Sequence, residues 1–133
     1  MSARVEFDSL AEVEALLRAG IELKFELADD SALLNGSPVY ATALHHLRDG
    51  LISGLRASST PGKANAQADW YRLAEHPHRW PLVARRAALH PQWRDLSEAE
   101  LRQWVETLAA PLVVDDETLA AVKAAGDEIL DRG

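Results

Sequence analysis

Two adjacent histidines and an aspartate occupy one face of the helix that the sequence predicts over residues 38–56. His45 precedes Asp49 by four residues and His46 precedes it by three, and side chains at these spacings meet on a helix surface. Imidazole and carboxylate groups are ligands for divalent metal ions. An aspartate that orients a histidine also raises the pKa of the ring and makes a general base. His45, His46 and Asp49 are therefore the candidate catalytic residues, and the alternative is an ordinary solvated helix face.

A second pair of histidines, His76 and His78, flanks Pro77. Such a pair is a weak candidate for metal ligation. Each His-Pro pair in the chain, at residues 76–77 and 90–91, is typical of a helix end, because a cation suits the C-terminal end of the helix dipole and the residue before proline avoids helical dihedrals. The sequence contains no H-E-x-x-H or comparable motif, so we expect neither a bound metal nor a cofactor.

Basic residues gather in the middle of the chain. Residues 37–96 carry a net charge of +4, whereas residues 1–36 carry −5 and residues 97–133 carry −6. Either the acidic ends pack against the basic middle, or the middle exposes a basic patch that binds a small anion. The candidate anion contacts are Arg56, Lys63, Arg85 and Arg86.

Two short segments resemble motifs of known families. Arg85 and His90 are separated by four residues, which is similar to the R-x(4–6)-H motif of HEPN-type nucleases, a class of small helical proteins. Residues 90–93 (His-Pro-Gln-Trp) are similar to the His-His-Pro-x-Trp element of pterin carbinolamine dehydratases, although the first histidine of that element is missing. With 11 Arg and five His in the chain, about one Arg–His match arises by chance, so we assign neither family.

Six helices are expected to carry these residues. Their predicted ranges are 9–19, 38–56, 66–75, 81–89, 98–110 and 116–131, with a loop at 57–64. The strongest signals are two capping boxes, Ser9 with Glu12 and Ser97 with Glu100, in which the side chains satisfy free backbone amides at the helix start. Pro38, directly after a serine, marks a further helix start.

Two further features concern helix packing. The buried face of helix 98–110 is predicted from apolar residues at helical spacing, which are Leu101, Trp104, Val105 and Leu108.

Gly50 and Gly54 lie on or beside the apolar stripe of helix 38–56, where each costs up to ~1 kcal/mol relative to alanine. We expect the close approach of a neighbouring element to offset this loss of helix propensity.

The segment 21–27 alternates apolar and polar side chains strictly, which is typical of a half-buried strand. Gly20 is expected to end the first helix in the left-handed conformation. Segments 3–7 and 32–34 are candidates for two further strands. The predicted fold is therefore α+β and predominantly α, with five or six helices and a small N-terminal β element. The edge strand would be able to pair with a strand of another chain.

Composition sets the remaining limits. A chain of 133 residues with 26% charged and 47% apolar residues is typical of one folded domain, which we place at residues 1–133. It contains no run of 18 apolar residues and no apolar segment at its N-terminus, so neither a membrane span nor a secretory signal is expected. Because the chain has no cysteine, it has no disulfide or thiolate chemistry, and we expect a cytoplasmic location.

These observations favour a small, soluble, cytosolic binding module without catalysis, of the adaptor, regulator or toxin-neutralising type. The alternative is a small His/Asp-dependent enzyme or metal-binding domain that uses the polar face of helix 38–56. A protein partner or a homodimer is expected, and a small anion is a further candidate ligand. A membrane is not expected as a partner, and neither is nucleic acid, because the net charge is −7.

Overall fold

The computed structural model describes residues 3–58 and 61–133, and six α-helices form within these ranges. They are α1 (Leu10–Glu22), α2 (Pro38–Ala57), α3 (Pro61–Trp70), α4 (Trp80–Ala87), α5 (Glu98–Ala109) and α6 (Asp116–Arg132). Four short helical turns accompany them: η1 (Leu23–Leu27), η2 (Leu33–Gly36), η3 (Leu73–Glu75) and η4 (Trp93–Asp95). The described residues contain no β-strand, and their one β-type pairing is an isolated bridge between Arg72 and Val113.

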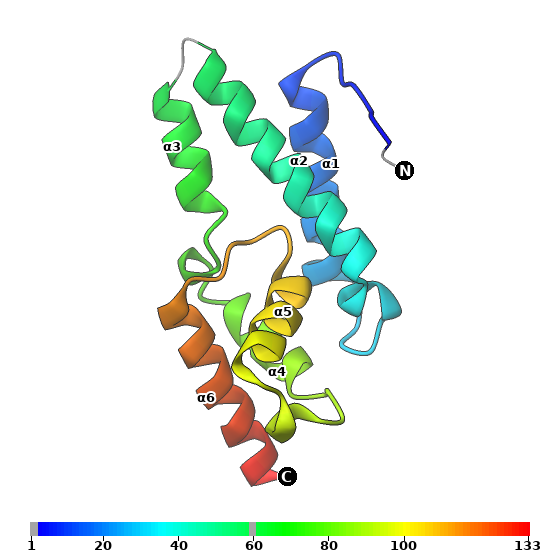
Figure 1. Cartoon of the computed structure of the whole chain (residues 1–133), viewed down its shortest axis with the longest axis vertical. Helices are drawn as coiled ribbons and strands as arrows, with labels where there is room; N and C mark the ends of the chain where they lie inside the picture. The colour runs from blue at the N-terminus through cyan, green and yellow to red at the C-terminus, as the bar shows by residue number, and fades with distance from the viewer. Residues whose placement is uncertain (1–2, 59–60) are drawn as a thin grey trace.

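The helices form two groups, with α1, α2 and α3 at one end of the molecule and α4, α5 and α6 at the other (Figure 1). α2 also contacts α5, and the segments that join α3 to α4 and α5 to α6 cross between the groups. The Leu73 amide donates to the Val113 carbonyl at 2.9 Å, and the Val113 amide donates to the Tyr71 carbonyl at 2.6 Å. These two backbone hydrogen bonds tie the crossing segments together.

Most of the helix starts follow from local sequence chemistry. In the first capping box the Ser9 amide donates to Glu12 Oε1 at 3.0 Å. In the second, the Ser97 amide donates to Glu100 Oε1 at 2.9 Å. The helix predictions that are confirmed, with ends shifted by a few residues, are those at 9–19, 38–56, 81–89, 98–110 and 116–131.

The third helix begins earlier than predicted. α3 runs from Pro61 to Trp70, so the predicted loop at 57–64 is wrong from Pro61 onward and the predicted helix 66–75 is wrong beyond Trp70. The physical reason is that proline fits the first turn of a helix, where its missing amide has no partner to lose. Residues 59–60 of the predicted loop lie outside the described residues.

The predicted N-terminal β element is wrong, and so is the α+β class. Residues 21–27 continue α1 through the π-helical turn η1, residues 33–34 begin the 3₁₀ turn η2, and residues 3–7 have no regular structure. The reason is that two periodicities fit the same residues. The buried side chains of the first helix repeat every four positions and are Val13, Leu17, Ile21 and Phe25. This helical stripe extends across the alternating segment, and burial against α2 favours it.

Gly20 does not end the first helix, because α1 continues through it to Glu22. A Cβ at this position would lie 2.8 Å from Cδ2 of Leu44 and 3.1 Å from the Tyr40 hydroxyl. The missing side chain lets α1 cross α2 closely, and it serves packing instead of a left-handed turn. Gly54 matches its prediction in the same way, since its Cβ would lie 2.5 Å from Leu10, whereas Gly50 faces open space.

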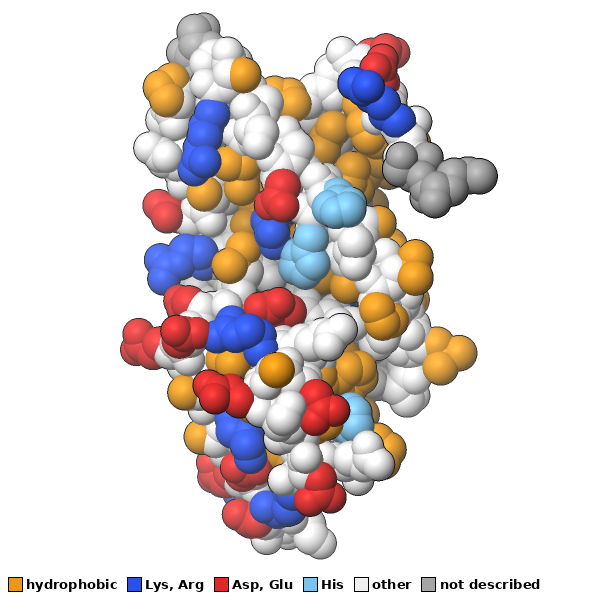
Figure 2. Space-filling model, viewed as in Figure 1, with side chains coloured by type: hydrophobic (Ala, Val, Ile, Leu, Met, Phe, Trp, Pro, Cys, Tyr) orange, Lys and Arg blue, Asp and Glu red, His pale blue; other side chains and the backbone are white. Residues whose placement is uncertain are grey.

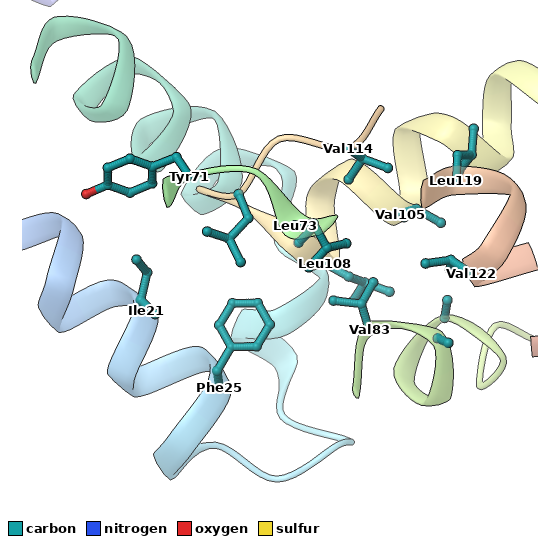
Figure 3. Packing of buried hydrophobic residues seen from close by; sticks show 14 of the residues in the cluster. Ile21, Phe25, Tyr71, Leu73, Val83, Val105, Leu108, Val114, Leu119 and Val122 are labelled. Carbon is teal, nitrogen blue, oxygen red and sulfur yellow. The ribbon is translucent and has the colours of Figure 1, made fainter. Parts of the chain in front are cut away.

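One cluster of buried apolar side chains runs through both helix groups and includes residues from α1 to α6. Figure 3 shows Ile21 and Phe25 at one end of this cluster and Leu119 and Val122 at the other. Leu73, from the crossing segment, lies between them. The core therefore continues across the boundary between the two groups.

The predicted buried face of α5 is confirmed except at its largest member. Leu101, Val105 and Leu108 are buried, but Trp104 is only partly buried at the edge of the core. The fully buried tryptophan is Trp93, whose indole Nε1 donates to Asp127 Oδ1 at 2.9 Å.

Replacing Gly126 by alanine is expected to destabilise the fold. A Cβ at Gly126 would lie 2.5 Å from Cζ2 of the buried Trp93 ring, which has little room to move. Overpacking of this kind costs about 1–3 kcal/mol, which exceeds the ~1 kcal/mol that alanine adds to helix propensity. We expect a net loss of about 1 kcal/mol in the free energy of unfolding, measured by chemical denaturation.

Gly50→Ala is the matched control, because it makes the same change in an α-helix at a position with no atom within 4 Å. This variant should gain up to ~1 kcal/mol. Equal stability of the two alanine variants would show that Gly126 is not in close contact with Trp93.

Candidate functional site

The polar face of α2 does not have the expected pairing. His45 is half-buried, whereas His46 and Asp49 are exposed. The Asp49 carboxylate accepts hydrogen bonds from Arg48, at 3.2 Å from Nε and 3.0 Å from Nη2. Both bonds go to Oδ1, so the hydrogen-bond partner of the Asp49 carboxylate is Arg48 and not a histidine.

His45 is held in a different way. Its Nδ1 lies 2.7 Å from Nη1 of Arg48, which also donates to the Pro111 carbonyl at 2.8 Å. A guanidinium can only donate, so Nδ1 of His45 accepts and carries no proton. Burial and, second, the Arg48 charge hold the pKa of His45 below its ordinary value. The expected increase in its pKa is thus wrong for His45, and the lone pair that a general base needs is already in use.

His76 and His78 also have separate environments. The buried His76 ring places Nε2 2.6 Å from the Trp70 carbonyl and Nδ1 3.1 Å from Nη1 of Arg79, so it links the end of α3 to the start of α4. His78 is exposed. Within residues 3–58 and 61–133, no group of three or more His, Cys, Asp or Glu side chains has an arrangement that could hold a metal ion.

Arg85 and Arg86, two of the candidate anion contacts, converge on Asp30. Arg85 binds it with two bonds, of 2.5 Å from Nε and 3.1 Å from Nη2, and Arg86 Nε lies 3.1 Å from Oδ1. These hydrogen bonds, with the one from Arg85 the largest cause, hold the pKa of Asp30 below its ordinary value. The other two candidates, Arg56 and Lys63, are exposed near the junction of α2 and α3, at the opposite end of the molecule (Figure 1).

Several ion pairs join the oppositely charged parts of the sequence in the folded chain. Besides the Asp30 cluster they are Arg72–Asp115 at 3.2 Å, Arg79–Glu26 at 3.4 Å and Arg94–Asp131 at 2.7 Å. Each joins the basic middle of the chain to one of its acidic ends. The interpretation that the acidic ends pack against the basic middle is therefore confirmed.

Lys24 is a buried cation that the sequence analysis missed. Its side chain is fully buried, and Nζ donates to the carbonyls of Thr107 at 2.9 Å and Ala110 at 3.0 Å, at the end of α5. Burial, followed by the nearby charge of Arg86, lowers the pKa of Lys24 to about 7. The signal was present in the helical register, because Lys24 lies three residues after Ile21 on the buried face of the first helix.

A hollow of the surface lies beside Trp104. It has a volume of about 370 Å³, and a neighbouring hollow has about 240 Å³. Gly36, His90 and Trp104 line both hollows, so the two lie side by side, and together we call them the Trp104 groove. The apolar side chains that line the larger hollow are Ala32, Leu33, Leu89, Pro91, Trp104 and Leu108. The smaller hollow is also lined by apolar Pro38 and Leu96 and by polar Glu100, Gln103 and Thr107.

Three neighbouring segments fix the orientation of the Trp104 ring. Its Nε1 donates to the Ala87 carbonyl at 3.1 Å. The His90 ring meets it edge-on, with centroids 5.2 Å apart and planes at 80°. Gly36 lies against its other side, where a Cβ would be 3.1 Å from two ring carbons. The indole between the two hollows is therefore rigid while it remains partly exposed.

Exposed aliphatic side chains border the Trp104 groove. Leu33 is 94% exposed and Leu89 is 59% exposed, and Val39, next to Pro38 in the lining, is 81% exposed. Figure 2 shows hydrophobic side chains along one edge of the molecule, beside a lower half on which acidic and basic side chains alternate. Sequence reasoning missed this surface because its members come from three separate segments and follow no single periodicity.

Comparison of the chain with models of protein families, with curated proteins and with solved structures found no match. None of the helices in the described part of the chain has both the length and the apolar composition that crossing a bilayer requires.

The stability of the protein is expected to rise with pH above neutrality because of Lys24. The pKa of this amine is about 7 in the folded state, whereas its ordinary value, expected in the unfolded chain, is 10.5. Between these values the unfolded chain binds more protons than the folded chain, so the free energy of unfolding increases with pH, by at most about 1.4 kcal/mol per unit. Denaturation of the wild type and of Lys24→Met between pH 7 and 9.5 measures the contribution. The difference between the two curves should grow with pH.

The control for this experiment is Lys63→Met, which removes an exposed lysine of α3. Its difference from the wild type should not vary with pH in this way. A flat difference curve for Lys24→Met would mean that the amine is solvated and not buried against α5.

His45 should titrate below the ordinary value of about 6.5 in NMR spectra of the folded protein. Arg48→Met removes the adjacent positive charge and is expected to raise the pKa of His45 part of the way back, because burial is the larger cause of the shift. Asp49→Asn, which keeps the Arg48–His45 contact, should leave the pKa low. A His45 pKa above 6.5 that falls in Asp49→Asn would instead support an Asp–His pair.

Proposed function

We propose that this chain is a non-enzymatic binding module that docks another protein on the Trp104 groove. The observation that carries the proposal is Leu33, which is 94% exposed at the border of an apolar hollow of about 370 Å³. A scattered surface leucine needs no explanation, but exposed aliphatic side chains gathered around a hollow are typical of interaction sites. We place the module in the cytoplasm, in agreement with its lack of cysteine.

The rigid indole of Trp104 supports this proposal. Tryptophan is enriched among the residues that contribute most to protein interfaces, where it fills desolvated pockets near the centre. Here its ring is already oriented by Ala87, His90 and Gly36. A partner would therefore lose little free energy to the ordering of this side chain.

The polar face of α2 supports catalysis less well. The lone pair of His45 and the Asp49 oxygen both accept from Arg48. The hollow beside them, lined by His45, Arg48 and Glu106 among others, has a volume of only about 170 Å³. This volume is below that of a typical small-molecule site, and the His45 lone pair that would act as a base is already in use.

Selection of binding sequences from a displayed random peptide library tests the proposal. The folded chain is the target, and NMR shift changes in the labelled chain locate each selected peptide. We expect enriched peptides with large apolar anchors, and shift changes centred on Trp104 and Leu89. Leu33→Ser should weaken binding by at least about tenfold, the loss of a typical interface anchor.

Leu16→Ser is the matched control, because Leu16 is a 48% exposed leucine on α1 that lines neither hollow. It should leave binding unchanged. The proposal fails if no peptide is enriched, or if the selected peptides bind at the His45 face instead.

A further inference from the structure

Resting on the proposed function, we infer that the Trp104 groove accepts one amphipathic helix from a basic protein. The apolar face of that helix would fill the two hollows, and its lysine or arginine residues would lie against the border of the groove. The inference depends on the shape of the groove, on the backbone of its walls and on the charges around it.

The groove has the shape that a helix face requires. Its two hollows, of about 370 Å³ and 240 Å³, adjoin at Trp104 and Gly36. Apolar side chains on one face of a helix recur every three or four residues, so successive anchors lie about 5–6 Å apart along its axis. A pair of neighbouring hollows therefore matches the pair of successive anchors that one helix face presents.

The walls of the groove disfavour an extended peptide. A peptide that binds as a strand needs a sheet edge with free backbone groups. Here the walls are η2, the end of α4 and α5, and their backbone amides are used locally. The Asn35 amide donates to Ala32, and the Leu89 and His90 amides donate to Arg86 and Ala87. Side-chain contacts are the interactions that remain, and a helix presents these.

The charges around the groove favour a basic partner. Arg85 and Arg86 already share Asp30 as a carboxylate partner. The exposed carboxylate of Glu100 lines the smaller hollow and accepts from the Ser97 amide at 2.9 Å. Among the described residues no lysine or arginine forms an ion pair with it, and the nearby charge that acts on it is that of His90. A lysine or arginine of the partner would supply such an ion pair.

The electrostatic field around the groove is also negative. Among the wall segments, residues 27–39 hold two acids and no base, and α5 holds three acids and one base. The two arginines at the end of α4 are paired with Asp30, so the walls are acidic on balance. A net charge of −7 speeds the approach of a basic protein and opposes the approach of a second copy. A basic helix is therefore favoured over self-association as the occupant.

Two synthetic helical peptides with the same leucine spacing test this inference. One carries lysine and the other glutamate at the positions that flank the leucine face. Fluorescence anisotropy with the full chain should give a dissociation constant at least about tenfold lower for the lysine peptide at low salt, and the difference should shrink as salt screens the charges. Glu100→Gln should reduce the preference, and glutamine still closes the capping box. Glu128→Gln on α6, away from the groove lining, is the matched control.

The outcomes separate this inference from the proposed function. If the glutamate peptide binds the groove as tightly as the lysine peptide, the docking site stands and the basic partner is wrong. If sedimentation shows a dimer that Leu33→Ser dissociates, a second copy occupies the groove and the inference is overturned. If neither peptide binds the groove while library peptides still do, the helical partner is wrong. Loss of all binding at the groove, library peptides included, overturns the proposed function as well.

Discussion

The end of α5 is held by hydrogen bonds from two basic side chains of the other half of the molecule. The last carbonyls of a helix have no partner within it, so donors from elsewhere in the fold satisfy them. Lys24 donates to Thr107 and Ala110, and Arg48 donates to Pro111 just beyond them. Because both donors belong to the first helix group, these bonds fix α5 against α1 and α2. Everything that α5 carries, including the wall of the Trp104 groove, depends on this arrangement.

Arg86, from the second helix group, in the same way satisfies carbonyls at the end of the first helix. Its guanidinium, almost fully buried on α4, donates to the carbonyls of Lys24 and Ala28 at the end of the first helix and pairs with Asp30. The turn after α1 is thereby set, and with it the position of Leu33 on the groove border. Two buried cations so close together raise each other's cost of charging. The lower pKa of Lys24 follows from this proximity and from burial.

The sequence was informative where a contact is local and misleading where it is not. Capping boxes join residues three positions apart, so the starts of α1 and α5 were predictable. The segment 21–27 satisfies both strand and helix periodicity, and only burial against α2 decides between them. The spacing of His45 and Asp49 predicted a pair, yet Arg48 binds the Asp49 carboxylate and is itself held by a carbonyl 63 residues away. Nothing in the local pattern reveals that distant partner, and the same is true of the Trp104 groove.

The ionic and apolar features of the surface complement each other. The segregated charges of the sequence left open whether the basic middle packs against the acidic ends or forms an exposed patch. Folding places Arg72, Arg79 and Arg94 against acidic groups from the two ends. Exposed pairs of this kind contribute little to stability, typically below about 1 kcal/mol each. Their larger effect is on what the surface attracts, since paired arginines no longer favour anions. In the part of the chain that the structure describes, a groove with apolar hollows and an oriented tryptophan then stands out as a surface without a partner. Shape and burial at Trp104 therefore support the proposed function more than the charge pattern does.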